Sequence, residues 1–126
     1  CAPTHNKEIA MNILMILNDP PYGTERCYNG LRLAKTLLTK DPSIELTVFL
    51  MADAIVCSKR GQKPPKGYYN LELMLKPVIR QGRVLICGNC MDARGLADED
   101  LTEGAIRSNM DVLATATLAA DKILVF

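Results

Sequence analysis

Short, continuously apolar runs recur along the chain and limit its possible folds more than any other feature. Such runs occupy Asn12 to Asn18 and Arg83 to Cys87, and Ile44 to Met51 is rich in β-branched and apolar residues. Runs of this length without polar alternation are typical of strands buried on both faces of a sheet. The segment Lys122 to Phe126 predicts a further strand at the end of the chain.

Segments with helical spacing separate these runs. The pattern predicts a helix that begins at a cap on Thr24 and continues to about Thr39. A second helix is expected over Tyr69 to Arg80, with a kink or an early stop at Pro77, and a long alanine-rich helix over Ile106 to Ala120. This alternation predicts an α/β fold whose mostly parallel sheet is covered on both faces.

The chain has the size of one domain. Its 126 residues are 48% hydrophobic, enough for a single core, and we expect that domain to span residues 11–126. Residues 1–10 are polar and contain Pro3 and Asn6, so we expect a disordered leader or tail there. They include His5, the only histidine, which argues against a serine–histidine triad or a histidine-based metal cage.

Composition excludes several classes of function. Fifteen basic residues against fourteen acidic ones, without a basic run, argue against nucleic acid as a partner. No apolar stretch approaches the roughly 20 residues that cross a membrane. Five cysteines without a scaffold-like spacing or a signal-peptide pattern predict reduced thiols in the cytoplasm, and no motif indicates a cofactor.

The segment that follows the third apolar run carries the strongest chemical signal. Ligands and reactive groups gather at the carboxyl ends of parallel strands, where Cys87 is expected. Gly88 and Asn89 leave the backbone free to turn its amides toward this thiol, and Arg94 can supply positive charge. Asp92 raises the pKa of a neighbouring thiol unless Arg94 pairs with it, so the net effect on Cys87 stays open.

A second cysteine in the same glycine-containing turn favours a functional Cys87 over inert packing, whereas the evidence on Cys90 itself is balanced. Cys27 and Cys57 lie among apolar residues and are expected in the core. A structural zinc site usually needs four ligands, so it would require sharing between subunits. The pair also comes too late in the chain for a thioredoxin-like fold, but a dithiol redox switch stays open.

Two loops are expected near the same edge of the sheet. Asn18 to Gly23 lacks a glycine-rich phosphate motif and reads as a proline–glycine turn. A short helix capped by Asp53 leads into the segment Ser58 to Gly67, which has the composition of a mobile loop. This loop is expected to cover the site or to contact another subunit.

Five spaced motifs together resemble the DsrE/DsrF-like superfamily, and within it the YchN-like branch. The resemblance runs from Met11 to Phe126. Its motifs are NDPPYGTERCYNGLRLA (residues 18–34), VFLMADA (48–54), RGQKP (60–64), CGNCMDARG (87–95) and ADKILVF (120–126).

The resemblance implies a three-layer α/β/α sandwich with about five strands, assembled as a homo-oligomer, commonly a trimer or hexamer. Sulfur carriers of this family hold sulfur as a persulfide on a cysteine that ends a strand and precedes Arg-Gly by seven and eight residues. Cys87 stands in that relation to Arg94 and Gly95. The resemblance therefore implies a sulfur carrier or sulfurtransferase whose partners are sulfur donor and acceptor proteins or small thiols.

Asn89, Cys90 and Asp92 follow the YchN-like branch, whereas the sulfur carriers have small apolar residues after the cysteine. Cys90 can attack a persulfide on Cys87, releasing sulfide and leaving a disulfide. The alternative function is a non-catalytic oligomeric binding or scaffold protein in which Cys87 and Cys90 bind a metal or sense redox state.

Overall fold

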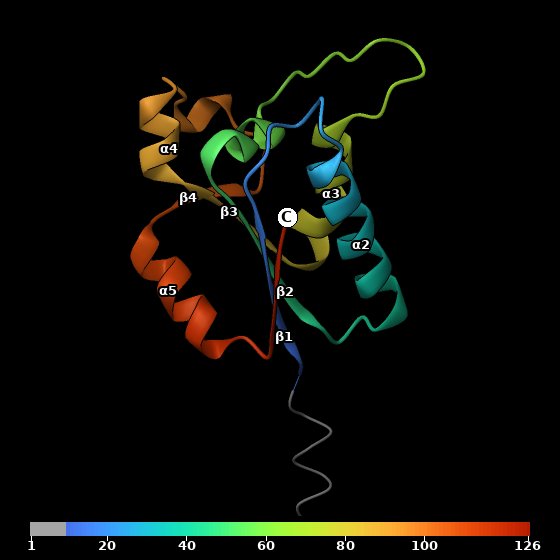
Figure 1. Ribbon diagram of the computed structural model, residues 1–126, viewed down its shortest axis with the longest axis vertical. Coiled ribbons are helices and arrows are strands. Elements are labelled where there is room, and N and C mark those ends of the chain that lie inside the picture. Colours follow the sequence, from blue (N-terminus) through green and yellow to red (C-terminus); the bar gives the residue numbers. More distant parts are fainter. Residues whose placement is uncertain (1–9) are drawn as a thin grey trace, which may run out of the picture.

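Five parallel strands form one sheet at the centre of the computed structural model, which describes residues 10–126 (Figure 1). The strand order is β4-β3-β2-β1-β5. The strands are β1 (Asn12–Leu17), β2 (Glu45–Leu50), β3 (Arg83–Cys87), β4 (Ala105–Ser108) and β5 (Lys122–Val125). The predicted α/β class, parallel sheet and strand number are confirmed, whereas the expectation about the N-terminal tail falls mostly on residues 1–9, outside the described residues.

Helices cover both faces of the sheet, as predicted. Figure 1 shows α2 (Arg26–Lys40) and α3 (Leu71–Gln81) on one side, and α4 (Gly88–Ala93) and α5 (Met110–Ala119) on the other. Two 3₁₀ helices, η1 (Ala52–Ser58) and η2 (Asp98–Asp100), complete the regular structure. Among residues 10–126, no helix has the length and apolar character needed to cross a membrane.

The core lies along the three central strands. Most residues of β1, β2 and β3 are buried, whereas every residue of the edge strands β4 and β5 is exposed or half-buried. Helix α2 adds Leu31, Ala34 and Leu38 from one face, as its spacing predicts. Burying apolar side chains from both sides of a strand explains why these runs lack polar alternation.

Helix α2 begins slightly later than predicted. Glu25 is the N-cap and adopts a left-handed conformation with φ of 64°, so the prediction that Thr24 is the cap was wrong. The hydroxyl of Thr24 still accepts a hydrogen bond from the Arg26 amide, at 3.4 Å. The short helix η1 is similarly capped by Met51, which places Asp53 in its first turn rather than at its cap.

Pro77 does not stop α3, which continues to Gln81. A proline inside a helix leaves the carbonyl four residues earlier without its amide partner. That carbonyl belongs to Leu73, whose side chain is 58% exposed, so this face of the helix is open to water. The helix can therefore tolerate the missing hydrogen bond.

The prediction of one helix over Ile106 to Ala120 was wrong at its start. Residues Ala105–Ser108 form edge strand β4, and α5 begins only at Met110. The Asn109 side chain caps α5 by accepting a hydrogen bond from the Val112 amide at 2.9 Å. A strand of four residues with two exposed side chains carries too little apolar pattern to be separated from the helix that follows.

Candidate functional site

Cys87 lies where a central strand ends and a helix begins. It is the last residue of β3 and the N-cap of α4, and its side chain is 7% exposed. On the neighbouring edge strand, Ser108 is its partner in the parallel register. The thiol therefore sits at the carboxyl edge of the sheet, as predicted, close to the surface but mostly shielded from water.

Opposing effects act on the charge of the Cys87 thiol. Burial raises its pKa, and the side chain of Cys90, with which it shares a hydrogen bond, raises it further. The backbone amides of Cys90 and Asn89 act in the other direction because they favour the thiolate. The net result is a pKa above the ordinary thiol value.

Cys90 is fixed by the segment that follows β2. Its sulfur accepts a hydrogen bond from the backbone amide of Ala52 at 3.2 Å. Ala52 has φ of 51°, a left-handed conformation that residues with a side chain rarely adopt. This contact ties the first turn of α4 to the start of η1 and keeps the second thiol beside the first.

Arg94 does not pair with Asp92, which was one of the arrangements that the sequence left open. Its guanidinium instead donates to Oδ1 of Asp53, with Nη2 at 2.8 Å and Nε at 3.0 Å, and Nη1 donates to the carbonyl of Cys90 at 3.2 Å. Arg94 therefore joins α4 to η1 and helps to hold Cys90. Its positive charge is largely committed to Asp53.

Arg107 pairs with Asp92 in place of Arg94. Nη2 of Arg107 lies 2.9 and 2.8 Å from the two carboxylate oxygens of Asp92, and Nη1 lies 3.9 Å from Asp98. The hydrogen bond that Arg107 donates to Asp92 raises the pKa of Arg107, and the charge of Cys87 contributes in the same direction. The positive charge of Arg107 thereby balances the negative charge of Asp92.

Gly88 shows how closely Arg107 approaches the start of α4. A Cβ atom added at Gly88 would lie 2.9 Å from Nε of Arg107 and 3.0 Å from the carbonyl oxygen of Ser108. The guanidinium therefore packs over the residue that follows Cys87. Sequence reasoning missed Arg107 because it assigned this residue to a helix; a strand beside β3 would have placed it here.

Asn89 is exposed and contributes its backbone amide to the environment of Cys87. The structure thus brings Cys87, Asn89, Cys90 and Asp92 together, with Arg94 at the edge of the group and Arg107 added to it.

Cys27 and Cys57 form a separate thiol pair in the core, which confirms the predicted packing. Their side chains are 1% and 0% exposed, and the Cys27 thiol donates to the carbonyl of Asp19 at 3.0 Å. A hydrogen bond from Cys57 lowers the pKa of Cys27, and the same interaction together with burial raises the pKa of Cys57. Neither thiol is open to a reactant.

The two predicted loops meet each other away from α4. The Tyr22 hydroxyl donates to Oε1 of Gln62 at 2.6 Å and accepts from the Leu71 amide at 3.2 Å. All four tyrosines stack in one cluster here, with neighbouring ring centroids 4.3 to 5.9 Å apart: Tyr22, Tyr28, Tyr68 and Tyr69. The loop Ser58 to Gly67 is thus anchored through Gln62. Its expected role as a cover over Cys87 stays a prediction.

The part of the chain that the structure describes contains no group of three or more histidine, cysteine, aspartate or glutamate side chains placed to hold a metal ion. Cys87 and Cys90 supply two sulfur ligands, which is half of what a structural zinc site usually takes. A metal at this pair would need ligands from another molecule.

Comparisons with known proteins give one consistent result. The sequence pattern of the DsrE/DsrF-like family matches residues 11–126. Protein YchN of Escherichia coli is 40% identical over 115 residues, which cover 90% of this chain and 97% of YchN. An uncharacterized protein of Methanocaldococcus jannaschii is 38% identical over 92% of this chain and all of its own length.

A solved structure and a more distant relative extend the comparison. The crystal structure of E. coli YchN superimposes with a TM-score of 0.88 at 39% identity, covering 92% of this chain and 99% of that one. The sulfurtransferase TusD of Cronobacter sakazakii is 25% identical over 129 residues, covering 92% of this chain and all of TusD.

Proposed function

The chain belongs to the DsrE/DsrF-like family, and from this premise we propose that it carries sulfane sulfur as a persulfide on Cys87. The observation that carries the proposal is the setting of this thiol. Cys87 ends a central strand, two backbone amides favour its anionic form, and the Arg107 guanidinium lies over the next residue. The similarity to a protein named a sulfurtransferase supports the same chemistry.

The transfer balances as two exchanges at sulfur. The Cys87 thiolate attacks the outer sulfur of a donor persulfide, R–S–SH; the donor S–S bond breaks, Cys87–S–SH forms, and R–S⁻ leaves with the bonding electron pair. An acceptor thiolate then attacks the outer sulfur on Cys87, and the Cys87 thiolate is regenerated. No external oxidant or reductant is needed, since sulfane sulfur moves between thiols.

Burial and the Cys90 side chain raise the pKa of Cys87, but three neighbouring groups favour the anionic forms of this cycle. Negative charge on the Cys87 sulfur is stabilised by the amides of Asn89 and Cys90 and by Arg107. Asp92 holds Arg107 in place through both carboxylate oxygens. Arg94 acts less directly, because it positions the α4 turn against Asp53.

A second function, a dithiol redox switch, is favoured by one specific contact. The Cys90 side chain acts on the Cys87 thiol and raises its pKa, and the first turn of α4 holds the two cysteines three residues apart. The Cys90 thiolate can attack the inner sulfur of Cys87–S–SH, releasing HS⁻ and forming a Cys87–Cys90 disulfide. In that case, the pair would release sulfide or report redox state rather than pass sulfur to an acceptor.

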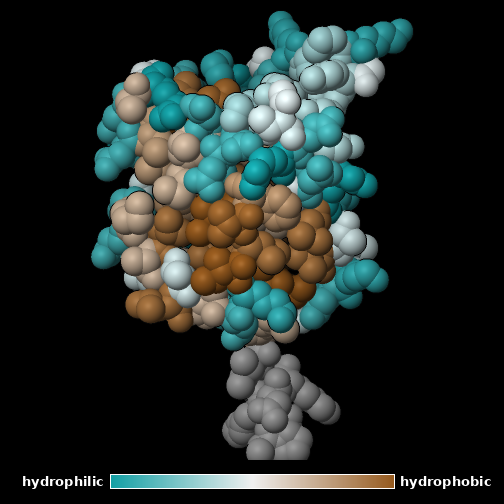
Figure 2. All heavy atoms as spheres, viewed as in Figure 1, coloured by the Kyte–Doolittle hydropathy of each residue, from teal (hydrophilic) through white to brown (hydrophobic). Residues whose placement is uncertain are grey.

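The proposal includes a homo-oligomer, as a trimer or hexamer. Figure 2 shows a large apolar area over the region where Figure 1 places β1, β5 and α5. Among these elements, α5 carries the exposed apolar side chains Met110 and Leu118, and β5 carries Ile123 and Val125. Apolar surface of this kind is typical of subunit interfaces, so we assign it to a second copy of the chain.

The other proposed partners are donor and acceptor proteins or small thiols. Their chemistry requires reduced cysteines, which the cytoplasm maintains, and we therefore place the protein there. This assignment rests on the proposed thiol chemistry.

Rapid mixing with a low-molecular-weight alkyl persulfide tests the proposed function. Wild type and Cys90→Ser should release a stoichiometric burst of alkyl thiol, whereas Cys87→Ser should release none. If Cys87→Ser gives the same burst as wild type, Cys87 is not the carrier. Sulfide release by wild type but not by Cys90→Ser would assign the resolving role to Cys90.

A further inference from the structure

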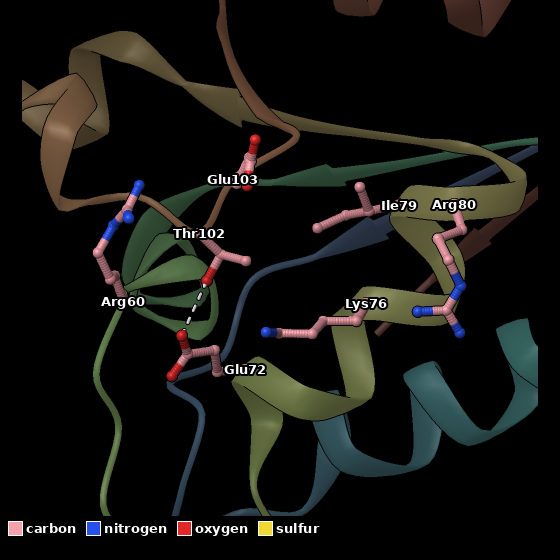
Figure 3. Close-up of a pocket in the computed structure, with 7 residues that line it drawn as sticks. All are labelled: Arg60, Glu72, Lys76, Ile79, Arg80, Thr102 and Glu103. Carbon is pink, nitrogen blue, oxygen red and sulfur yellow. Dashed lines mark hydrogen bonds between the residues drawn. The ribbon is translucent and has the colours of Figure 1, made fainter.

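A charged hollow of about 310 Å³ lies apart from the cysteine pair, between α3 and the segment that precedes β4 (Figure 3). Its walls carry three cationic side chains and two carboxylates. They are Arg60, Lys76, Arg80, Glu72 and Glu103, with Thr102 between them. Of these residues only Arg60 belongs to one of the five motifs, RGQKP, and the sulfur chemistry uses none of them.

Glu72 is already occupied by neighbouring donors. Its Oε1 accepts the amide of Gln62 at 2.9 Å, and its Oε2 accepts the hydroxyl of Thr102 at 3.4 Å (Figure 3). Burial works to raise the pKa of Glu72, but the amides of Gln62 and Gly61 outweigh it, and the pKa is lowered. Glu72 is therefore an ionised, fixed wall of the hollow.

The cations are less completely satisfied. Within residues 10–126, none of the three forms an ion pair, and the guanidinium of Arg60 donates only its Nε, to the carbonyl of Leu101 at 3.0 Å. In Figure 3 the Lys76 ammonium points into the hollow, with Arg60 and Arg80 on opposite sides of it. Lys76 and Arg80 stand one helical turn apart on α3, where like charges repel.

We propose that this hollow binds a small organic anion through a carboxylate or phosphate group placed against Lys76 and Arg80. An anion there would gain charge-assisted hydrogen bonds from the two cations. The volume lies at the lower end of the roughly 300–1,000 Å³ range of small-molecule sites, so the ligand is a small metabolite. Glu103 is exposed at the rim and directs the anionic end toward α3.

Titration with inorganic phosphate and, separately, with malonate tests the site, at constant ionic strength maintained with sodium chloride. Backbone amide chemical shifts of residues 60–62 and 102–104 should change and saturate with at least one anion. Saturable binding of phosphate alone would indicate a phosphorylated ligand, and saturable binding of malonate alone would indicate a ligand with a carboxylate group. Lys76→Gln and Arg80→Gln should each weaken binding by about tenfold.

Lys40→Gln is the matched control because Lys40 also lies in the last turn of a helix, α2, and is exposed. It should leave the affinity unchanged, as should Cys87→Ser, since the site is independent of sulfur transfer. Shifts that do not saturate with either anion would overturn the proposal. Equal affinities in wild type, Lys76→Gln and Arg80→Gln, or equal losses in Lys40→Gln, would also overturn it.

Discussion

At the scale of single residues, Cys87 combines shielding with local support for negative charge. Burial raises the pKa of its thiol, while two amides and Arg107 favour the anion. A raised pKa reduces the thiolate population at neutral pH, but each thiolate is then a stronger nucleophile. The thiol is thus protected at rest without losing its ability to attack a donor persulfide.

The raised pKa of Cys87 predicts how its alkylation depends on pH. Because only the thiolate reacts, the rate with iodoacetamide should still be rising at pH 9.0, the ordinary thiol value, and should level off only above it. Peptide mass spectrometry of pH-stepped reactions measures this, with fragment ions separating Cys87 from Cys90. A plateau below pH 8 would contradict the account.

Arg107 should matter more to transfer than Arg94. Arg107 is exposed and acts on Cys87 through its charge, so solvent screening makes its effect modest, and Arg107→Gln should slow alkyl thiol release about threefold. Arg94→Gln is the matched control, because Arg94 pairs with Asp53, and its loss should be smaller. Equal rates in wild type and Arg107→Gln would show that Arg107 is not part of the site.

At the scale of elements, the sequence predicts what is buried and misses what lies at an edge. Strands β1, β2 and β3 follow from unbroken apolar runs, and α2 from the spacing of Leu31, Ala34 and Leu38. Strand β4 was missed because most of its side chains are exposed or half-buried and it merges with α5 in pattern. Asn109 followed by Asp111 was the available signal for the true helix start.

The candidate site also has a part that could be predicted from the sequence and a part that could not. Its consecutive residues, Cys87 to Asp92, were predictable because one strand end and one turn contain them. Its partners from other elements were not predictable from spacing. Arg107 reaches the site from β4, and Asp53 and Ala52 come from η1, so only the tertiary fold pairs them with α4.

The helix boundary itself can be tested. Asn109→Ala removes the side-chain oxygen that caps α5 and should lower the free energy of unfolding by about 1 kcal/mol. Urea denaturation measures this. Asn29→Ala, on the exposed face of α2, should change stability by less than about 0.5 kcal/mol; equal effects of the two substitutions would argue against the cap.

At the scale of the whole molecule, the layered fold separates three surfaces. The cysteine pair lies at the carboxyl edge of the sheet, the charged hollow lies beside α3, and the apolar area lies over β1, β5 and α5. A stable interface buries about 800 Å² per partner. The apolar area is therefore the surface on which the proposed oligomer depends.

Leu118→Glu should dissociate that oligomer. Leu118 is 89% exposed on α5, and a carboxylate there would have to be buried against the second copy. Sedimentation velocity should show a smaller species than wild type. Leu73→Glu, at a 58% exposed leucine of α3, is the control and should leave assembly unchanged. If Leu118→Glu has the same mass in solution as wild type, the interface does not include this face of α5.

The central claim is sulfur carriage on Cys87, and peptide-resolved mass spectrometry after exposure to an alkyl persulfide tests it most directly. In Cys90→Ser, we predict that the peptide holding Cys87 gains the mass of one sulfur atom and loses it when an acceptor thiol is added. Wild type should show the same gain or the Cys87–Cys90 disulfide that follows it. No gain in Cys90→Ser, or an equal gain in Cys87→Ser, would contradict the account.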